Sequence, residues 1–389
     1  MKGLAPEDEK IIEEIIKEVR KATRFEIPWE KARELYSPID WFKMMLKMFP
    51  FLWFMRKWGK TSTLDLTKRF KNPLLRQALL TYAELPDYPA IVLLMALAWH
   101  HQKYAGFVMG GSLEFARAIE RRYLNLGGEI NYKSRVAKIL VENDNAVGIR
   151  LADGSEHRSD IVISAADGRT TIFDMLEGKY INDKIRGYYD NYPLYPPLIQ
   201  IALGVGRSFN ELPHLVSGIN YPLDEPVTIA GQELKRLGVH VYNFDPSLAP
   251  EGKTVLKVLL NSDYEYWKKL KQDPERYKVE KAQIADQVIA LLDQRFPGLA
   301  DQVEMRDVAT PMTWERYTGN WRASHEGWLM TTKNLSMRLS KTLPRLKNFY
   351  MVGQWVEPGG SLPYVAVSGR NVTQIICKQD KRKFVTSTP

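Results

Sequence analysis

The stretch that most constrains the fold lies near the end of the chain, where "FYMVGQWVEPGGSLPYVAVSGRNVTQII" runs from residue 349 to 376. A short apolar segment, 349–352, enters a loop rich in glycine and proline, and a segment with apolar residues at helical spacing leaves it. Strand, glycine-rich loop and helix in this order can cradle a nucleotide phosphate, because the helix start presents free N–H groups and a positive dipole end. The alternative interpretation is a plain turn before a C-terminal helix.

The composition is that of a globular protein with a large core. Its 389 residues are 44% hydrophobic and 26% charged, which is enough for about two or three domains. The longest apolar run, 89–99, is far shorter than the roughly 20 residues that a membrane span needs. The charged N-terminus has no signal sequence, and the single cysteine, Cys377, fits a reducing compartment. We therefore expect a cytoplasmic protein. A peripheral position on the inner face of the membrane is compatible with this expectation.

The charge is +9, but basic residues alternate with acidic ones, which argues against nucleic acid as a partner. One exception is the segment "WFKMMLKMFPFLWFMRKWGK", Trp41–Lys60, which has no acidic residue. It predicts two short helices interrupted at Pro50. Tryptophan, phenylalanine and methionine with interspersed lysines are typical of a helix in a membrane interface. The compatible alternative is a core or lid helix over an apolar pocket.

Periodicity predicts the main elements of the chain. Helices are expected at 7–24 and 73–101, after the glycines at 110–111, and at 276–296, where "FPG" ends the helix. Three runs at 136–141, 147–151 and 161–164 predict a small β-meander. Proline-rich loops and strand-like runs in 180–260 predict an open sheet, either mixed or antiparallel.

Several common catalytic motifs are absent from the sequence. "GVGRSF" at Gly204 lacks the third glycine of a dinucleotide fingerprint, and neither a P-loop nor a GxSxG motif occurs. The six histidines show no metal-ligand spacing, so we expect no metal site. Nucleotide-dependent phosphate transfer and serine-hydrolase chemistry therefore have no support.

Three segments carry a resemblance to a known family. They are "MGGSLEFARAIERRYLNLGGEI" with its continuation to "DIVISAAD", "TPMTWERYTGNWRASHEGW", and the closing motif G-[DEQ]-x(3)-PGG-x(2)-P-x(4)-SGR. In order and spacing they resemble the phytoene desaturase, carotenoid isomerase and retinol saturase flavoproteins, over most of residues 104–389. The resemblance implies an α+β fold, an α/β flavoprotein of the amine-oxidase/phytoene-desaturase type. It would combine a partial FAD-binding domain with a mixed-sheet substrate domain and a helical cap.

The resemblance also implies a domain division. Residues 1–105 would form the helical cap and substrate entry, 106–178 the middle of the FAD-binding domain, 179–336 the substrate domain, and 337–389 the C-terminal part of the FAD-binding domain. The N-terminal βαβ unit of the family, which carries GxGxxG, has no counterpart in this sequence. We therefore expect a fragment, an internal-start product, or a chain that needs a partner, and FAD binding by this chain is an open question.

The implied cofactor is FAD, and the resemblance carries its contacts to matching positions. A strand valine would contact the adenine end, a Gly–Gln pair would lie near the pyrophosphate and ribityl chain, and the loop and helix start would lie beneath the isoalloxazine ring. The residues are Val136, Gly353, Gln354, Gly359, Gly360, Ser361, Leu362 and Pro363. Gln354 replaces the commoner acid. The alternative is that the loop only packs against the C-terminal helix.

The implied function is an FAD-dependent oxidoreductase that desaturates, saturates or isomerises a long apolar polyene or isoprenoid. The flavin carries such chemistry, so we name no catalytic residue. Substrate contacts are predicted in "WERYTGNWRASHEGW", or else this is an ordinary packed segment. The candidates are Arg316, Tyr317, Trp321, His325 and Trp328. The alternatives are a flavin amine oxidase-like enzyme and a flavin-free fragment that binds a membrane or a partner.

Overall fold

The computed structural model describes residues 3–26, 30–83, 85–213, 217–335 and 337–386. The chain forms two compact units, and each is assembled from segments that are distant in the sequence. The first unit contains residues 1–106, 136–194 and 326–389, and the second contains 107–135 and 195–325.

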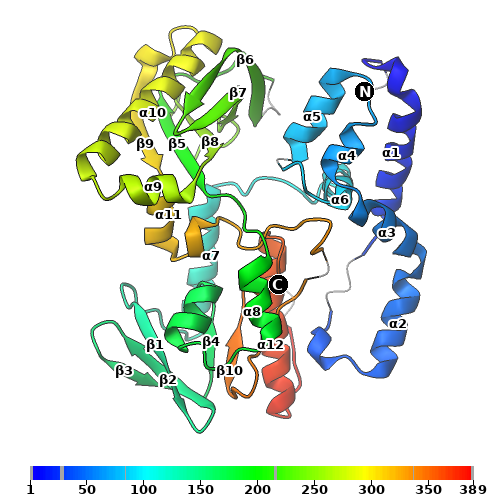
Figure 1. Ribbon diagram of the computed structural model, residues 1–389, viewed down its shortest axis with the longest axis vertical. Helices are drawn as coiled ribbons and strands as arrows, with labels where there is room; N and C mark the ends of the chain where they lie inside the picture. The colour runs from blue at the N-terminus through cyan, green and yellow to red at the C-terminus, as the bar shows by residue number, and fades with distance from the viewer. Residues whose placement is uncertain (1–2, 27–29, 84, 214–216, 336, 387–389) are drawn as a thin grey trace. The chain divides into compact units, whose positions relative to one another are not determined.

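The N-terminal part of the first unit is helical (Figure 1). Its helices are α1 (Glu9–Ala22), α2 (Pro38–Met48), α3 (Leu52–Lys60), α4 (Thr63–Thr67), α5 (Pro73–Ala83) and α6 (Ala90–His101), with short 3-10 turns η1 (Pro6–Asp8), η2 (Arg33–Leu35) and η3 (Phe49–Phe51). Helix α6 is apolar on nearly all sides, and α1 buries Ile11, Ile12 and Ile15 in the same core. The predicted helices at 7–24 and 73–101 are confirmed, the second as two helices, and so is the interruption at Pro50.

Two small sheets follow in the same unit. Strands β1 (Val136–Glu142), β2 (Asn145–Leu151) and β3 (Glu156–Arg158) form an antiparallel sheet. Strand β4 (Val162–Ser164) pairs instead with β10 (Phe349–Met351), in parallel. The predicted meander is therefore wrong in its third strand. A short apolar run suits a buried parallel strand as well as a meander strand, so the sequence pattern did not distinguish the two partners.

The remaining helices of the first unit are η4, a π-helix (Thr170–Met175), α8 (Asp183–Asn191) and α12 (Leu362–Gln379). Helix α12 packs on β10 through Val372 and Ile375, which contact Tyr350 and Ala32. The buried Gln374 accepts a 2.7 Å hydrogen bond from the Ala32 N–H and donates one to the carbonyl of Glu30 at 2.8 Å. These two bonds attach the chain before η2 to the C-terminal helix.

The second unit is built on a five-stranded sheet of order β6-β7-β8-β5-β9. The strands are β5 (Leu198–Val205), β6 (Gly218–Ile229), β7 (Gln232–Val241), β8 (Thr254–Asn261) and β9 (Val303–Ala309). Every pairing is antiparallel, which decides between the two sheet types that the sequence left open. Strand β5 lies between β8 and β9, and its residues alternate between half-buried and fully buried positions.

Helices cover this sheet. They are α9 (Tyr264–Leu270), α10 (Pro274–Arg295) and α11 (Pro311–Thr318), with 3-10 turns η5 (Ala300–Gln302) and η6 (Trp321–Ala323). Helix α7 (Gly111–Asn125) belongs to the same unit, but none of its residues is buried. Val288 of α10 and Trp267 of α9 are fully buried in the same core as Ile201 of β5. Helix α10 begins at an Asp273 cap, and it ends before "FPG", as the sequence predicts.

Candidate functional site

The turn after β10 is held by hydrogen bonds from both sides. The Val352 N–H donates to the carbonyl of Ser164 at 2.9 Å, which continues the pairing with β4. The Gly353 N–H donates to Oγ of Ser368 on α12 at 2.8 Å, and that buried hydroxyl donates to the carbonyl of Val365 at 2.6 Å. The carbonyl of Gly353 accepts from two N–H groups, those of Val356 at 3.2 Å and Glu357 at 3.1 Å. The position of Gly353 is therefore fixed by its own backbone contacts.

Gly353 presents its backbone to open space. Its φ is +98°, a conformation that side-chain-bearing residues rarely adopt. A Cβ atom added there would meet no atom within 4 Å. The glycine is thus required by the turn, and a ligand could approach the backbone closely beside it. The amide of the adjacent Gln354 is half-buried and makes no hydrogen bond within the described part of the chain.

The other two loop glycines have a different environment. Gly359 and Gly360 also have positive φ, +119° and +62°. A Cβ at Gly359 would lie 3.1 Å from Cε of Met330, and one at Gly360 would lie 2.6 Å from Cβ of Glu326. Both glycines therefore let the loop pack closely against the segment 326–330 of its own chain.

Helix α12 begins directly after this loop. Ser361 has the extended backbone of an N-cap, but its side chain makes no capping hydrogen bond. Leu362 is 61% exposed, and Pro363 occupies the first turn. The first N–H groups of a helix have no partner inside the helix, so this end can accept an anionic or electron-rich group.

Trp355 of the turn packs in an aromatic cluster. Trp328 and Trp355 are buried with ring centres 5.3 Å apart, and Trp328 Nε1 donates to the carbonyl of Trp355 at 3.3 Å. The ring of Tyr189 packs edge-on to Trp328 at 4.9 Å. Burial, and secondarily the charge of Asp167, raises the pKa of the Tyr189 hydroxyl, so this tyrosine stays neutral. Trp328 was predicted from the sequence as a substrate contact, and it lies in this cluster.

An ionic cluster holds the far end of the turn. The ammonium of Lys341, which is 4% exposed, lies 2.7 Å from Oε1 of Glu357 and 3.2 Å from Oε1 of Glu34. Arg338 lies 3.5 Å from the other oxygen of Glu357, and burial lowers the pKa of its guanidinium while Glu357 raises it. These residues could not be predicted from the sequence, because no local pattern marks partners that are 307 positions apart.

The other predicted site residues are distributed over both units. Val136, at the start of β1, is half-buried and pairs with Leu151 in the first unit. The remaining predicted substrate residues, Arg316, Tyr317, Trp321 and His325, belong to the second unit.

The substrate candidates in the second unit differ in exposure. Tyr317 is 76% exposed on α11, with the Arg316 guanidinium 5.4 Å from its ring centre. His325 is half-buried, and its Nδ1 lies 3.0 Å from the carbonyl oxygen of Pro196. Burial lowers the pKa of this imidazole, and the contact with the Pro196 carbonyl opposes that effect.

The described residues also bear on metal binding and on membrane insertion. No group of histidine, cysteine, aspartate and glutamate side chains among them has the geometry to hold a metal ion. None of the helices in those ranges combines the length and apolar content that a bilayer crossing requires.

Two curated proteins are similar to this chain in sequence. The chain is 26% identical over 287 residues to a chloroplastic prolycopene isomerase of Arabidopsis thaliana, covering 72% of this chain and 47% of that protein. It is 29% identical over 296 residues to a zeta-carotene-forming phytoene desaturase of Myxococcus xanthus, covering 73% of this chain and 54% of that one. The chain thus spans about half the length of the curated relatives that it matches.

The fold and the family follow from two further matches. The crystal structure of an oxidoreductase from Methanosarcina mazei superposes with a TM-score of 0.54 at 20% identity, covering 88% of this chain and 74% of that one. This agreement, together with the family match below, confirms the predicted α+β fold of the flavoprotein type. The family model described as flavin containing amine oxidoreductase matches residues 46–377, and it confirms the predicted flavin cofactor. Because this match spans most of the chain, the protein belongs to the flavin-containing amine oxidoreductase family.

Proposed function

We propose that this chain is an FAD-dependent oxidoreductase, or a part of one, that acts on the carbon–carbon bonds of a long apolar polyene or isoprenoid. The reaction would be desaturation, saturation or isomerisation of a carotenoid-like or retinoid-like substrate. The names of its relatives, prolycopene isomerase and phytoene desaturase, support this substrate class over an amine. The observation that carries the proposal is the Gly353 turn, whose backbone faces open space at the end of β10.

The residues around this turn fit a flavin dinucleotide. Gly353 and Gln354 would contact the pyrophosphate and ribityl chain, since the glycine leaves room and the amide can bond to hydroxyls. The loop from Gly359 to Pro363 would lie beneath the isoalloxazine ring, shaped by its packing against segment 326–330. The backbone of Val136 would contact the adenine end. A flavin supplies the hydride chemistry, so the protein has to bind, orient and exclude water.

The start of α12 would stabilise negative charge on the flavin. A helix N-terminus carries a partial positive charge, and an anionic group there gains about 0.3–1 kcal/mol, more when it is partly buried. Ser361 leaves its hydroxyl free of a capping bond within the helix, so this oxygen is also available to a ligand. The proposed substrate contacts remain Arg316, Tyr317, His325 and Trp328, and the four predicted domain ranges remain predictions.

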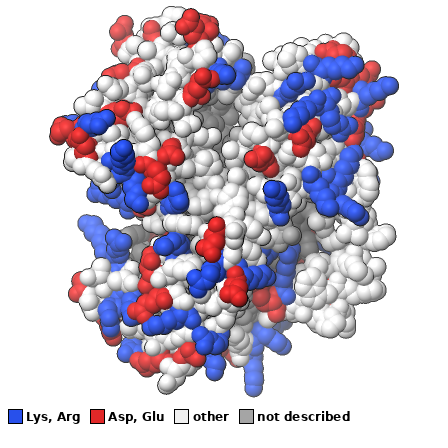
Figure 2. Space-filling model, viewed as in Figure 1, with Lys and Arg blue, Asp and Glu red and all other residues white. Residues whose placement is uncertain are grey.

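A substrate of this class partitions into a bilayer, so the protein would collect it there. We propose that Trp41–Lys60 contacts the membrane surface, with the protein in the cytoplasm on the inner face of the membrane. None of the residues of α2 is buried, and Trp41 and Phe42 are 48% and 57% exposed. Figure 2 shows an almost uncharged surface over α2. Such an apolar surface suits a membrane interface better than water.

An absorbance scan of the purified protein tests the cofactor first. We expect a flavin band near about 450 nm, either as purified or after addition of FAD. A protein that stays colourless and does not bind added FAD would favour the flavin-free fragment instead.

Turnover of the flavin-loaded protein with a panel of polyenes and a panel of amines tests the substrate class. Turnover of amines alone would establish the amine oxidase alternative.

A further inference from the structure

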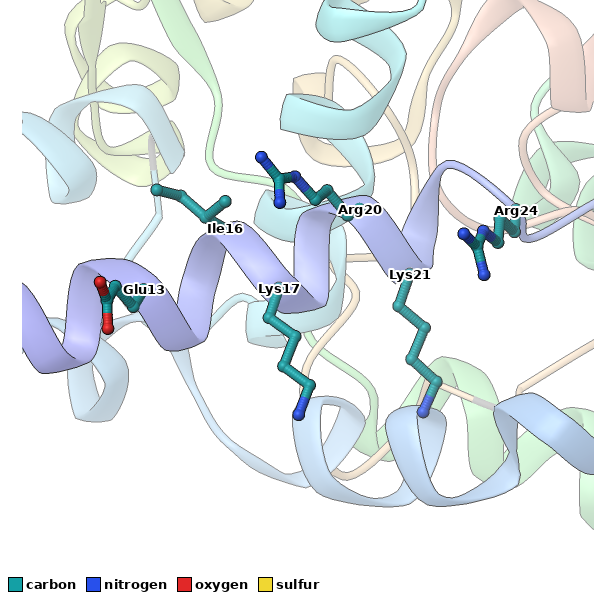
Figure 3. Close-up of a pocket in the computed structure, with 6 residues that line it drawn as sticks. All are labelled: Glu13, Ile16, Lys17, Arg20, Lys21 and Arg24. Atoms are coloured by element: carbon teal, nitrogen blue, oxygen red, sulfur yellow. The ribbon is translucent and has the colours of Figure 1, made fainter.

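The outer face of α1 carries a basic groove. It has a volume of about 510 Å³, and it lies opposite the buried isoleucine face of the helix. Its lining residues are Glu13, Ile16, Lys17, Arg20, Lys21 and Arg24 (Figure 3). Within the described ranges, Lys17, Arg20 and Arg24 form no ion pair. Four cations therefore share this groove with a single acid, and an anionic ligand would relieve their mutual repulsion.

The groove adjoins an exposed aromatic side chain. The Lys21 ammonium lies 5.6 Å from the ring centre of Trp53 and 5.9 Å from that of Phe54, both on α3. Phe54 is buried, but Trp53 is 59% exposed. The basic surface of α1 thus continues directly into the apolar surface that begins at α3.

Helix α2 extends this apolar surface, and its own sequence fixes it as a helix. Ser37 and Asp40 form a capping box at its start, which stabilises this exposed helix locally. Its apolar residues recur at helical spacing on one face, while Lys43 and Lys47 lie on the other. The exposed apolar side chains of α2, of the turn after it and of the start of α3 are Ile39, Trp41, Phe42, Met45, Leu46, Phe49 and Leu52.

We infer that the α1 groove binds the phosphate groups of anionic lipid headgroups while Trp53 and the apolar face of α2 enter the acyl boundary of the same bilayer. The inference deepens the proposed membrane contact and rests on it. A cationic groove beside an exposed aromatic and methionine face matches both layers of an anionic bilayer surface. A soluble phosphate or a nucleic acid would neutralise the positive charge of the groove, but it would leave the apolar face of α2 in water.

Co-sedimentation of the full chain with vesicles tests this inference without any flavin or polyene. We expect strong binding to vesicles of phosphatidylcholine with about 30 mol% phosphatidylglycerol, and weak binding to phosphatidylcholine alone. Binding should weaken as NaCl rises from about 0.05 M to about 0.5 M, because salt screens exposed charges.

A groove variant and a matched control separate the effect of the groove on vesicle binding from the effect of the protein's net charge. The groove variant is K17Q/R20Q/K21Q/R24Q, and the control variant is K269Q/K271Q/R276Q/K278Q, which removes the same charge from exposed positions in the second unit. We expect the groove variant to lose anionic-vesicle binding by about 100-fold and the control variant to lose far less. Circular dichroism checks the folding of each variant.

A third variant tests the apolar face of α2. The variant W41S/F42S/L46S should bind anionic vesicles weakly, and the salt dependence of its binding should be unchanged.

Three outcomes would overturn the inference. They are equal binding of wild-type protein to neutral and anionic vesicles, an unaffected groove variant, and groove-dependent binding of a DNA or RNA duplex without vesicle binding. None of these results depends on FAD. A protein that lacks a flavin band but binds anionic vesicles would refute the proposed enzyme alone, whereas normal FAD titration without vesicle binding would refute the headgroup site alone.

Discussion

Lys341 donates a 2.7 Å hydrogen bond to Glu357, and this bond joins the segment before β10 to the turn that follows it. The lysine side chain is almost fully buried, so the pair is shielded from water. A buried ion pair contributes little net stability, but loss of one partner leaves an uncompensated charge. The pair therefore fixes the end of the Gly353 turn in one position.

Lys341→Met should destabilise the first unit. Glu357 and Glu34 would lose their shared cation, and the cost should be about 3 kcal/mol in the free energy of unfolding. Urea denaturation measures it. The matched control is Lys253→Met, which breaks an exposed pair with Glu304 and should cost less than about 1 kcal/mol. Equal losses for the two variants would contradict a buried role for Lys341.

Gly353→Ala should weaken FAD binding specifically. The new Cβ would enter the open space beside the turn, and the positive φ would strain the backbone by about 1–2 kcal/mol. Gly154→Ala is the control, because its φ is +89° and its Cβ would likewise meet nothing within 4 Å. We expect similar losses of stability, but a rise of about tenfold or more in the FAD dissociation constant for Gly353→Ala alone. Titration of FAD fluorescence measures that constant.

Gly360→Ala should disrupt the packing of the loop. Its Cβ would overlap the side chain of Glu326, and such overpacking costs roughly 1–3 kcal/mol. The double variant Gly360→Ala with Glu326→Gly removes the obstructing side chain, so it should recover part of the loss. A double-mutant cycle in thermal unfolding measures this coupling. Additive effects of the two changes would show that the loop and residue 326 do not touch.

His325 should make the second unit less stable in mild acid. Burial lowers the pKa of its imidazole in the folded protein, so the unfolded chain binds the proton more readily. The free energy of unfolding should fall as the pH drops below about 6.5, by no more than about 1.4 kcal/mol per pH unit for this group. Burial lowers the pKa of His240 as well, so a smaller fall should persist after substitution.

His325→Asn tests the assignment, because an asparagine amide can replace the donor to Pro196 but does not titrate. Unfolding in urea at several pH values between about 5 and 7.5 should give a shallower slope for this variant than for wild type. An identical slope would show that His325 is not a source of the pH dependence.

The elements marked by local chemistry follow from the sequence. The periodicity of α1 and α10, the interruption at Pro50 and the strand–loop–helix order at 349–376 all reflect contacts within a few residues. The flavin family could also be predicted, because the motif around Gly353 is contiguous. The contacts predicted for single residues, such as Val136 and Tyr317, remain to be tested by experiment.

Long-range relationships could not be predicted in this way. The pairing of β4 with β10, the grouping of Glu34, Lys341 and Glu357, and the packing of Gly360 on Glu326 each join distant positions. A short apolar strand or a single charged residue looks the same in the sequence whatever its partner. Most helices and strands, and the glycine-rich loop itself, could be read from local sequence signals. The separate roles of the loop glycines could not, because they depend on which atoms the folded chain brings near each one. Gly353 opens on free space, whereas Gly359 and Gly360 allow close packing.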